Sequence, residues 1–192
     1  MTRTDEETTP NPQPITEKQV IVSFYITQLS LLVIALPLLW WQGKLNWGYF
    51  GVTNIHMWIW GAVAGLGIVF LELVLIRIVP EKWLDDGGIN RLLLGRRSPV
   101  HIFFIAAVAA VAEEMFFRGA VQHWLGIGWT TLLFVLVDTR YLRQWVLVLF
   151  LTLISFLFGW LVEWSGTLVP AVAAHWTVDF LMGLYLRFAD EK

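Results

Sequence analysis

The chain has 192 residues, of which 57% are hydrophobic and only 15% are charged, and it contains twelve tryptophans. A composition this apolar excludes an ordinary soluble domain and indicates a protein that crosses a membrane several times. The formal net charge of −2 gives no reason to expect a nucleic-acid partner, and the lack of cysteine excludes disulfides, thiol nucleophiles and cysteine-ligated metals.

The N-terminal segment differs from the rest of the chain. Residues 1–18 are polar and acidic, contain three prolines, and lack the basic segment and cleavage site of a signal peptide. We expect a disordered cytoplasmic tail over residues 1–18, followed by a helical membrane domain over residues 19–188.

Long apolar runs then succeed one another, each near or above the roughly 18–20 residues that span the hydrocarbon layer. These runs cover residues 20–41, 47–71, 99–124, 145–162 and 167–186. A shorter helix is expected at residues 129–138. The sequence therefore predicts an all-α membrane protein, a bundle of about six transmembrane helices of which one is short.

Loop charges orient such a bundle, because lysine and arginine are retained on the cytoplasmic side. With the N-terminus inside and six crossings, Lys44 alone falls outside and Arg118 lies within the membrane, which leaves eleven of the thirteen basic residues inside. We therefore expect a multi-pass protein of the cell membrane with both termini in the cytoplasm. The inner basic residues are Arg3, Lys18, Arg77, Lys82, Arg91, Arg96, Arg97, Arg140, Arg143, Arg187 and Lys192.

Small residues mark one helix face in the second apolar run. Gly61 and Gly65 lie four residues apart, a spacing that lets two helices approach closely. We expect close helix packing there, within the bundle or between two copies of the chain in a homo-oligomer.

Three ionisable residues, Glu113, Glu114 and Arg118, interrupt the third apolar run. Each charge near the bilayer centre costs on the order of 3 kcal/mol on insertion scales, so these side chains must face protein or water. Glu114 and Arg118 stand in the order that favours an ion pair across one helical turn, and a pair that serves packing alone is the alternative interpretation. Glu113 has no local partner, and a carboxylate in a membrane interior suits a general base.

A second polar group comes from two later helices. Asp138 ends the short helix, and His175 and Asp179 share one face of the last helix, where Asp179 can accept a proton from His175 and fix its ring. Counted from the outer helix ends at about 1.5 Å per residue, Glu113, Asp138 and His175 lie roughly 13–17 Å deep. We expect Glu113, Asp138, His175 and Asp179 to line one cavity.

Two motifs resemble those of the CPBP intramembrane proteases, the family of CAAX prenyl endopeptidases and of bacterial abortive-infection or bacteriocin-processing homologues. Residues 113–119 read EEMFFRG, similar to the family motif EExxxR, and residues 175–179 read HWTVD, similar to HxxxN/D. Both lie on apolar helices in the family's order, and the motif-bearing core covers residues 99–188. The resemblance implies a helical membrane bundle that performs intramembrane proteolysis.

The resemblance also implies roles for these side chains. In such proteases the first glutamate and a histidine in a middle FxxxH motif are thought to activate a water, and the last histidine with its Asn or Asp partner supports the oxyanion. Carried over, Glu113 is the base, and His175 with Asp179 is the electrophilic pair. The middle motif departs from the pattern, because residues 134–138 read FVLVD and place Asp138 where histidine is expected. In a catalytic site Asp138 and Glu113 would then share one proton.

The sequence favours an intramembrane endopeptidase that cleaves a membrane-associated peptide or protein without a cofactor. Its candidate catalytic residues are Glu113, Glu114, Arg118, Asp138, His175 and Asp179. A divalent metal held by Glu113, Asp138, His175 and Asp179 is the rival chemistry, although there is one central histidine and no HExxH motif.

An inactive pseudoprotease is the alternative from a different class of function. Such a protein would act as a membrane scaffold, an immunity protein or an envelope regulator, and the change at Asp138 favours it. A chain this short without an organelle signal is typical of bacteria, so we expect a bacteriocin-like or envelope peptide as substrate rather than a prenylated protein.

Overall fold

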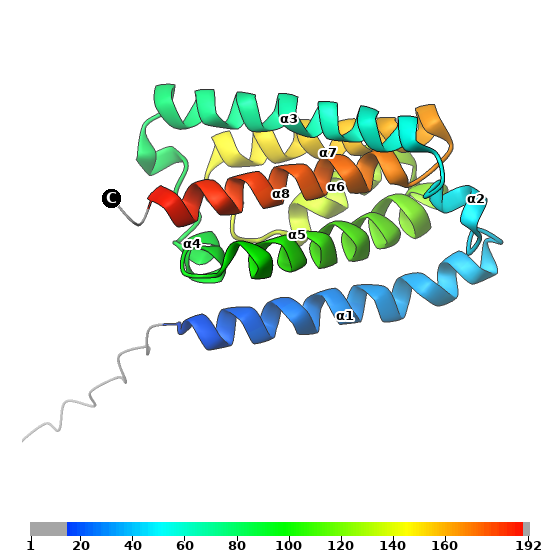
Figure 1. Cartoon of the computed structure of the whole chain (residues 1–192), viewed down its shortest axis with the longest axis horizontal. Coiled ribbons are helices and arrows are strands. Elements are labelled where there is room, and N and C mark those ends of the chain that lie inside the picture. Colours follow the sequence, from blue (N-terminus) through cyan, green and yellow to red (C-terminus); the bar gives the residue numbers. More distant parts are fainter. Residues whose placement is uncertain (1–14, 190–192) are drawn as a thin grey trace, which may run out of the picture.

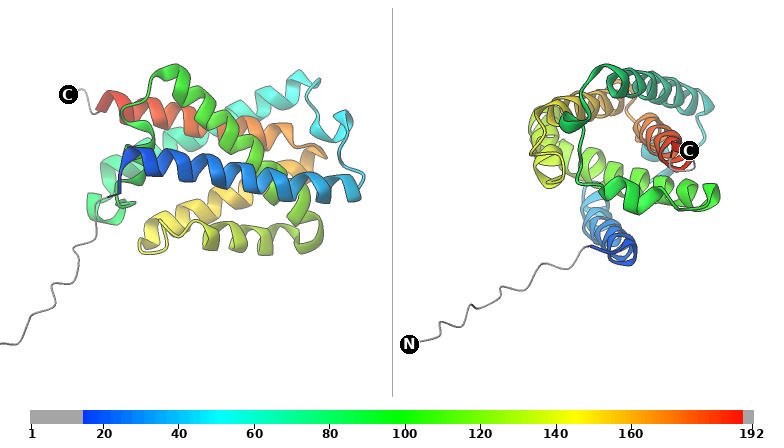
Figure 2. Two further views of the ribbon diagram at one scale, coloured as in Figure 1. Left: turned by 90° about the horizontal axis from the view of Figure 1, so that it is seen from below. Right: turned by 90° about the vertical axis from the view of Figure 1, so that its left-hand side faces the viewer.

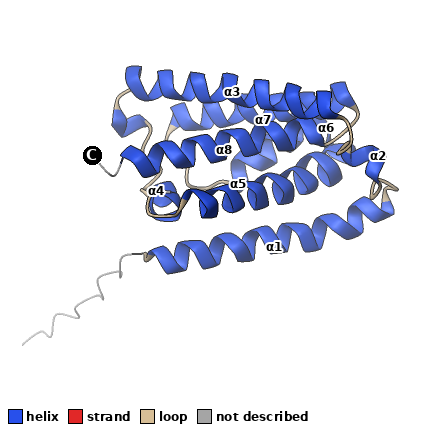
Figure 3. Ribbon diagram, in the orientation of Figure 1, coloured by secondary structure: helices blue, strands red, loops and turns tan. Residues whose placement is uncertain are grey.

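The computed structural model describes residues 15–189, and the regular elements in that range are all helical (Figure 3). Thr16 caps the first helix, because its hydroxyl accepts from the backbone N–H of Gln19 while the Gln19 side chain accepts from the backbone N–H of Thr16. The helix starts at Glu17, so residues 17 and 18 belong to it rather than to a tail. The remainder of the expected tail, residues 1–14, lies outside the described residues, as do residues 190–192.

The helices follow in chain order, several of them started by a polar cap. Asn46, Asn54 and Ser98 each accept a backbone N–H at the start of a helix, and Pro99 occupies the first turn of the helix after Ser98. The elements are α1 (Glu17–Trp41), α2 (Trp47–Phe50), α3 (Ile55–Ile78), η1 (Glu81–Trp83), α4 (Ile89–Leu94), α5 (Pro99–Glu114), η2 (Met115–Val121), α6 (Gln122–Val137), α7 (Trp145–Ser165) and α8 (Val169–Ala189).

Five helical stretches among the described residues are long and apolar enough to cross a membrane, so the chain is a multi-pass membrane protein. The third stretch, Pro99–Val137, is 39 residues long and contains a kink at Gly126, whose φ of 70° and ψ of 174° are not helical. The kink separates the long helix through residue 125 from a short one over residues 127–137. This confirms the expected bundle of about six helices with one short member. The start of α1 and the end of α8 accordingly lie at the same end of the bundle (Figure 1).

The close packing expected at Gly61 and Gly65 lies between α3 and α8. A Cβ at Gly65 would lie 2.7 Å from both the carbonyl oxygen of Ala174 and the Cβ of Thr177, and a Cβ at Gly61 would lie 2.7 Å from that of Ala173. Only glycine lets the two backbones approach this closely. The glycine face is therefore covered by α8 of the same chain.

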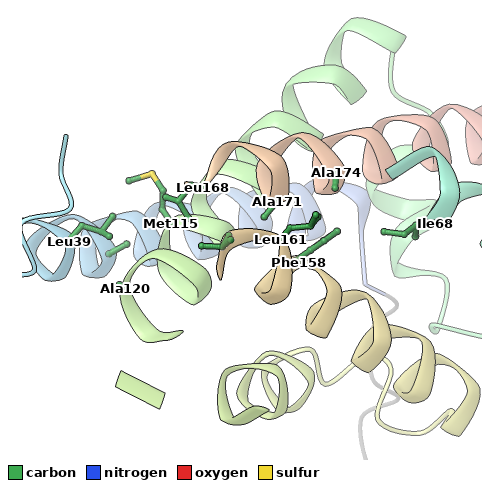
Figure 4. Close-up of a cluster of buried hydrophobic side chains, with 11 residues drawn as sticks. Leu39, Ile68, Met115, Ala120, Phe158, Leu161, Leu168, Ala171 and Ala174 are labelled. Carbon is green, nitrogen blue, oxygen red and sulfur yellow. The ribbon is translucent and has the colours of Figure 1, made fainter. Parts of the chain in front are cut away.

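The last helix lies between α3 and α5 and also packs against α7 and α4 (Figures 1 and 2). Its buried face is built from small residues, Ala171 and Ala174 among them, which meet Phe158 and Leu161 of α7 in the main apolar core (Figure 4). Because small side chains admit close neighbours, polar residues on α8 are held within reach of three other helices.

The first helix packs along one side of the bundle, against α5, η2 and α4 (Figure 2). At its N-terminal end, Glu17 lies within 3.4 Å of both Arg96 and Arg97. After its C-terminal end, Gln42 and Lys44 donate to the carbonyl oxygens of Ala120 and Gly119 in η2. η2 is a π-helix, a widened turn that is common at functional sites, and it follows directly after the two glutamates.

Candidate active site

Glu114 and Arg118 form an ion pair in the centre of the bundle, as the spacing predicts. Arg118 Nη1 donates to Glu114 Oε1 at 3.1 Å, and both side chains have no exposed area. Arg118 Nη2 donates to the hydroxyl oxygen of Ser155 on α7 at 2.9 Å and to its carbonyl oxygen at 3.2 Å. The pair therefore ties α5 and η2 to α7.

Aromatic rings enclose the Arg118 guanidinium. Its centre lies 4.5 Å from the ring of Phe134, 5.5 Å from Phe158 and 5.9 Å from Phe117. Contacts of this kind contribute about 0.5–2 kcal/mol each. Phe134 opens the FVLVD segment, so this motif supplies packing for the buried arginine.

The imidazole of His175 joins the two motifs. Its Nδ1–H donates to Glu114 Oε1 at 2.9 Å, and its Nε2 lies 3.4 Å from Asp179 Oδ2 and 4.0 Å from Glu113 Oε2. The ring stacks on Phe158 at 5.4 Å between centroids. With a carboxylate at each nitrogen, the ring is oriented and can hold two protons.

Glu113 differs from its neighbour Glu114 in exposure and partners. Its side chain is 22% exposed, and its Oε1 accepts a hydrogen bond from Gln28 Nε2 of α1 at 2.9 Å. Its second oxygen, Oε2, is the one that faces His175. Glu113 is thus the motif glutamate that a substrate or water can reach.

Glu113, Asp138, His175 and Asp179 all line one large cavity of about 1600 Å³, as expected. Apolar residues of α1, α5, α7 and α8 form much of the wall, and Glu72 of α3 also lines it near Asp179. The connection that includes η1 and α4 lines the cavity at the end of the bundle where α1 starts (Figure 1). The cavity is larger than the 300–1,000 Å³ typical of small-molecule pockets, which leaves room for a peptide segment.

Asp138 lines the cavity but is not paired with Glu113, which corrects the expected proton-sharing pair. Both of its oxygens accept from Arg140, at 2.8 Å from Nε and 2.9 Å from Nη2. Arg140 Nη1 donates to Asn90, whose amide donates to the hydroxyl of Tyr141. Asp138 ends its helix, and the following turn brings the Arg140 cation to it, so its partner is Arg140 rather than Glu113.

Asp138, Arg140 and Tyr141 lie in the connection after α6, outside the membrane spans. Burial would lower the pKa of Arg140, but the hydrogen bonds to Asp138 and the nearby Tyr141, Asp138 and Glu113 raise it above its usual range. Burial raises the pKa of Tyr141 to about 12. Arg140 therefore stays cationic and Tyr141 stays a neutral phenol at physiological pH.

The described part of the chain contains no cluster of ligands for the divalent metal considered as the rival chemistry. Across residues 15–189, no three His, Asp or Glu side chains are placed to hold one metal ion. Of the four side chains considered, Asp138 is engaged by Arg140, while Glu113 and Asp179 lie 4.0 Å and 3.4 Å from Nε2 of His175.

Sequence reasoning missed the partners that orient the motif residues. Gln28 and Ser155 are polar side chains within long apolar helices, where a polar group needs a partner inside the protein. Thr27, Ser30 and Thr152 are polar too, so the sequence alone did not single out the two partners. Glu72 is a third case, a carboxylate in an apolar helix that faces the cavity.

The candidate residues lie in a part of the chain that matches the model of a known protein family. The family model described as type II CAAX prenyl endopeptidase Rce1-like matches residues 95–181, which contain all six candidate residues. A protein of Bacillus subtilis (strain 168) named "Uncharacterized protein YpbD" is 38% identical over 131 residues, which are 68% of this chain and 69% of that protein. No solved structure matches the chain.

Proposed function

We propose that this chain, which belongs to the family of Rce1-like type II CAAX prenyl endopeptidases, hydrolyses a peptide bond in a membrane-associated peptide or protein. One observation carries the proposal. Glu113 presents a carboxylate oxygen to a large cavity at 4.0 Å from His175, while the buried Glu114 holds that histidine in place. A base beside an oriented imidazole is the pairing that water attack on an amide requires.

In the proposed reaction a water in the cavity attacks the carbonyl carbon of the substrate. Glu113 takes one proton from the water as the new C–O bond forms, and the carbonyl oxygen becomes an oxyanion. His175, oriented by Glu114 and Asp179, donates a hydrogen bond to that oxygen. The C–N bond then breaks, and Glu113 returns the proton to the leaving nitrogen.

The cavity supports a peptide substrate that lies partly in the bilayer. Its apolar walls match the side chains of a membrane-associated peptide, and the connection between α3 and α5 adds charged residues to its lining. A bacteriocin-like or envelope peptide fits this description.

The proposed chemistry needs only side chains of this chain, so we propose catalysis without a cofactor. Full activity after dialysis against a chelator would support this proposal. A loss of activity that a divalent metal restores would contradict it.

Orientation in the membrane follows from the loop charges. The connection between α3 and α5 and the one between α6 and α7 hold five arginines and Lys82, at the same end as the start of α1. We propose that this end faces the cytoplasm and that the cavity opens toward it.

Hydrolysis is tested with purified protein in proteoliposomes and a panel of membrane peptides between about pH 5 and about pH 8. Wild type is expected to cleave a subset of peptides, and Glu113→Gln to lower kcat by about 10²–10⁴-fold. Glu163→Gln is the matched control, because Glu163 is exposed and lies away from the cavity. Cleavage by Glu113→Gln at the wild-type rate would overturn the assignment of the base.

A scaffold without catalytic activity is the second candidate, favoured by the arginine-bound Asp138 in place of the family's histidine. A scaffold should keep its cellular effect with Glu113→Gln but lose it when helix packing is broken, as in Gly65→Leu. No cleavage by wild type together with full cellular function of Glu113→Gln would establish the scaffold and eliminate the protease.

A further inference from the structure

We propose that Gln28 is a positioning residue of the site, which holds Glu113 with its amide nitrogen and orients the attacking water with its amide oxygen. The inference rests on the proposed endopeptidase function. Gln28 belongs to α1, outside residues 95–181 that match the family model, so the motifs assign it no role.

The placement of Gln28 is set by the buried face of α1. Four residues of this helix are buried, Val20, Gln28, Ala35 and Leu39, and Gln28 is the polar one among them. Its side chain is only 4% exposed, and it lines the cavity together with Glu113. A polar side chain on the protein-facing side of a membrane helix needs hydrogen-bond partners, because lipid supplies none.

Only half of the Gln28 amide is satisfied in the structure. Its Nε2 donates to Glu113 Oε1 at 2.9 Å, whereas its Oε1 is buried and has no partner among the described residues. A buried acceptor without a partner costs about 1–3 kcal/mol. The described side chains supply no donor to this oxygen, and in the proposal a water molecule of the cavity next to Glu113 supplies it.

The contacts of the Glu113 carboxylate set the place proposed for that water. Gln28 engages Oε1 of Glu113, which leaves Oε2 toward His175 at 4.0 Å, a separation too long for a hydrogen bond but one that a water can bridge. A water that donates one hydrogen to Glu113 and the other to Gln28 Oε1 points a lone pair away from both. That lone pair forms the bond to the substrate carbonyl while the first hydrogen passes to Glu113.

A purely structural bond between α1 and α5 is the competing explanation. Such interhelical bonds contribute about 0.6 kcal/mol on average in membranes. α1 is also held by Glu17 at its N-terminal end and by the contacts of Gln42 and Lys44 with η2 after its C-terminal end. Loss of the Gln28 bond should therefore leave the helix in place, so that the two explanations separate by experiment.

The test compares wild type with Gln28→Met, Gln28→Asn and Glu113→Gln on a peptide that wild type cleaves. Gln28→Met keeps the length and removes both polar atoms; it is expected to lower kcat about a hundredfold with KM and the unfolding temperature unchanged. Gln28→Asn restores an amide and should recover part of kcat. Thr27→Val, the adjacent polar residue that lines the cavity, is the matched control and should behave as wild type.

Each outcome of this test supports or overturns the inference. The expected loss in kcat, with partial recovery by Gln28→Asn, supports it. Wild-type kcat in Gln28→Met while Glu113→Gln is inactive overturns the role of Gln28 alone and leaves the protease standing. A fall in unfolding temperature that matches the loss of activity makes Gln28 structural and also overturns it. No cleavage by wild type removes both proposals together.

Discussion

Glu114 and His175, 61 residues apart in the chain, meet in a buried hydrogen bond of 2.9 Å. The same Glu114 oxygen accepts from Arg118, so one carboxylate joins the EExxxR and HxxxD motifs. Glu114 has no exposed area and does not line the large cavity, whereas Glu113 does. The two adjacent glutamates therefore have different surroundings, because Glu114 holds the histidine and Glu113 faces the cavity.

Removing one partner of the buried Glu114–Arg118 ion pair should destabilise the protein. Arg118→Met leaves the Glu114 carboxylate without its cation, and breaking a buried pair costs about 3–5 kcal/mol. The double variant Arg118→Met with Glu114→Met is expected to be more stable than Arg118→Met alone. Thermal unfolding in detergent measures both; a double variant less stable than the single one would contradict the pairing.

Helix contact at Gly65 should be sensitive to a single methyl group. Gly65→Ala places a Cβ 2.7 Å from Ala174 of α8 and is expected to cost about 1–3 kcal/mol by forcing α3 and α8 apart. Gly67→Ala is the matched control two residues away, because nothing lies within 4 Å of its added Cβ. Equal unfolding temperatures for the two variants would rule out the described α3–α8 contact.

The Asp138–Arg140 pair should stabilise the protein to the same extent across ordinary pH. Because the pKa of Arg140 is raised, its contribution is fully present below its usual pKa and is lost only at more alkaline pH. Arg140→Gln is expected to cost about 1 kcal/mol at both about pH 6 and about pH 9. Arg143→Gln, at an exposed position, is the control. A cost that disappears at the higher pH would contradict this assignment.

Both termini should lie in the cytoplasm. The two ends of the described chain lie at one end of the bundle, together with the basic connections (Figure 1). A reporter fused after Lys192 that is active only in the cytoplasm, compared with one inserted after Gly43 that is active only outside, is the expected pattern. Activity of the Lys192 fusion outside the cell would invert the topology.

Much of the site was predictable because the evidence is local in the sequence. A charge in an apolar helix must face the protein interior, so Glu113, Glu114, Arg118, His175 and Asp179 were identified without a structure, and the Glu114–Arg118 pair followed from spacing within one helix. Asp138 lines the expected cavity, but its partner was wrongly predicted, because it ends its helix and the following turn brings Arg140 to it.

The sequence by itself determined the membrane class, the helical spans, the additional short helix and the helices that carry ionisable residues, because composition and periodicity depend on neighbouring positions alone. Only the tertiary structure decided that Gln28 binds Glu113 across 85 residues and that Glu114 rather than Glu113 holds His175. Those contacts depend on which helices are adjacent and how each is rotated about its axis. Both are set by packing, such as the glycine contact of α3 with α8, which is a property of the whole bundle.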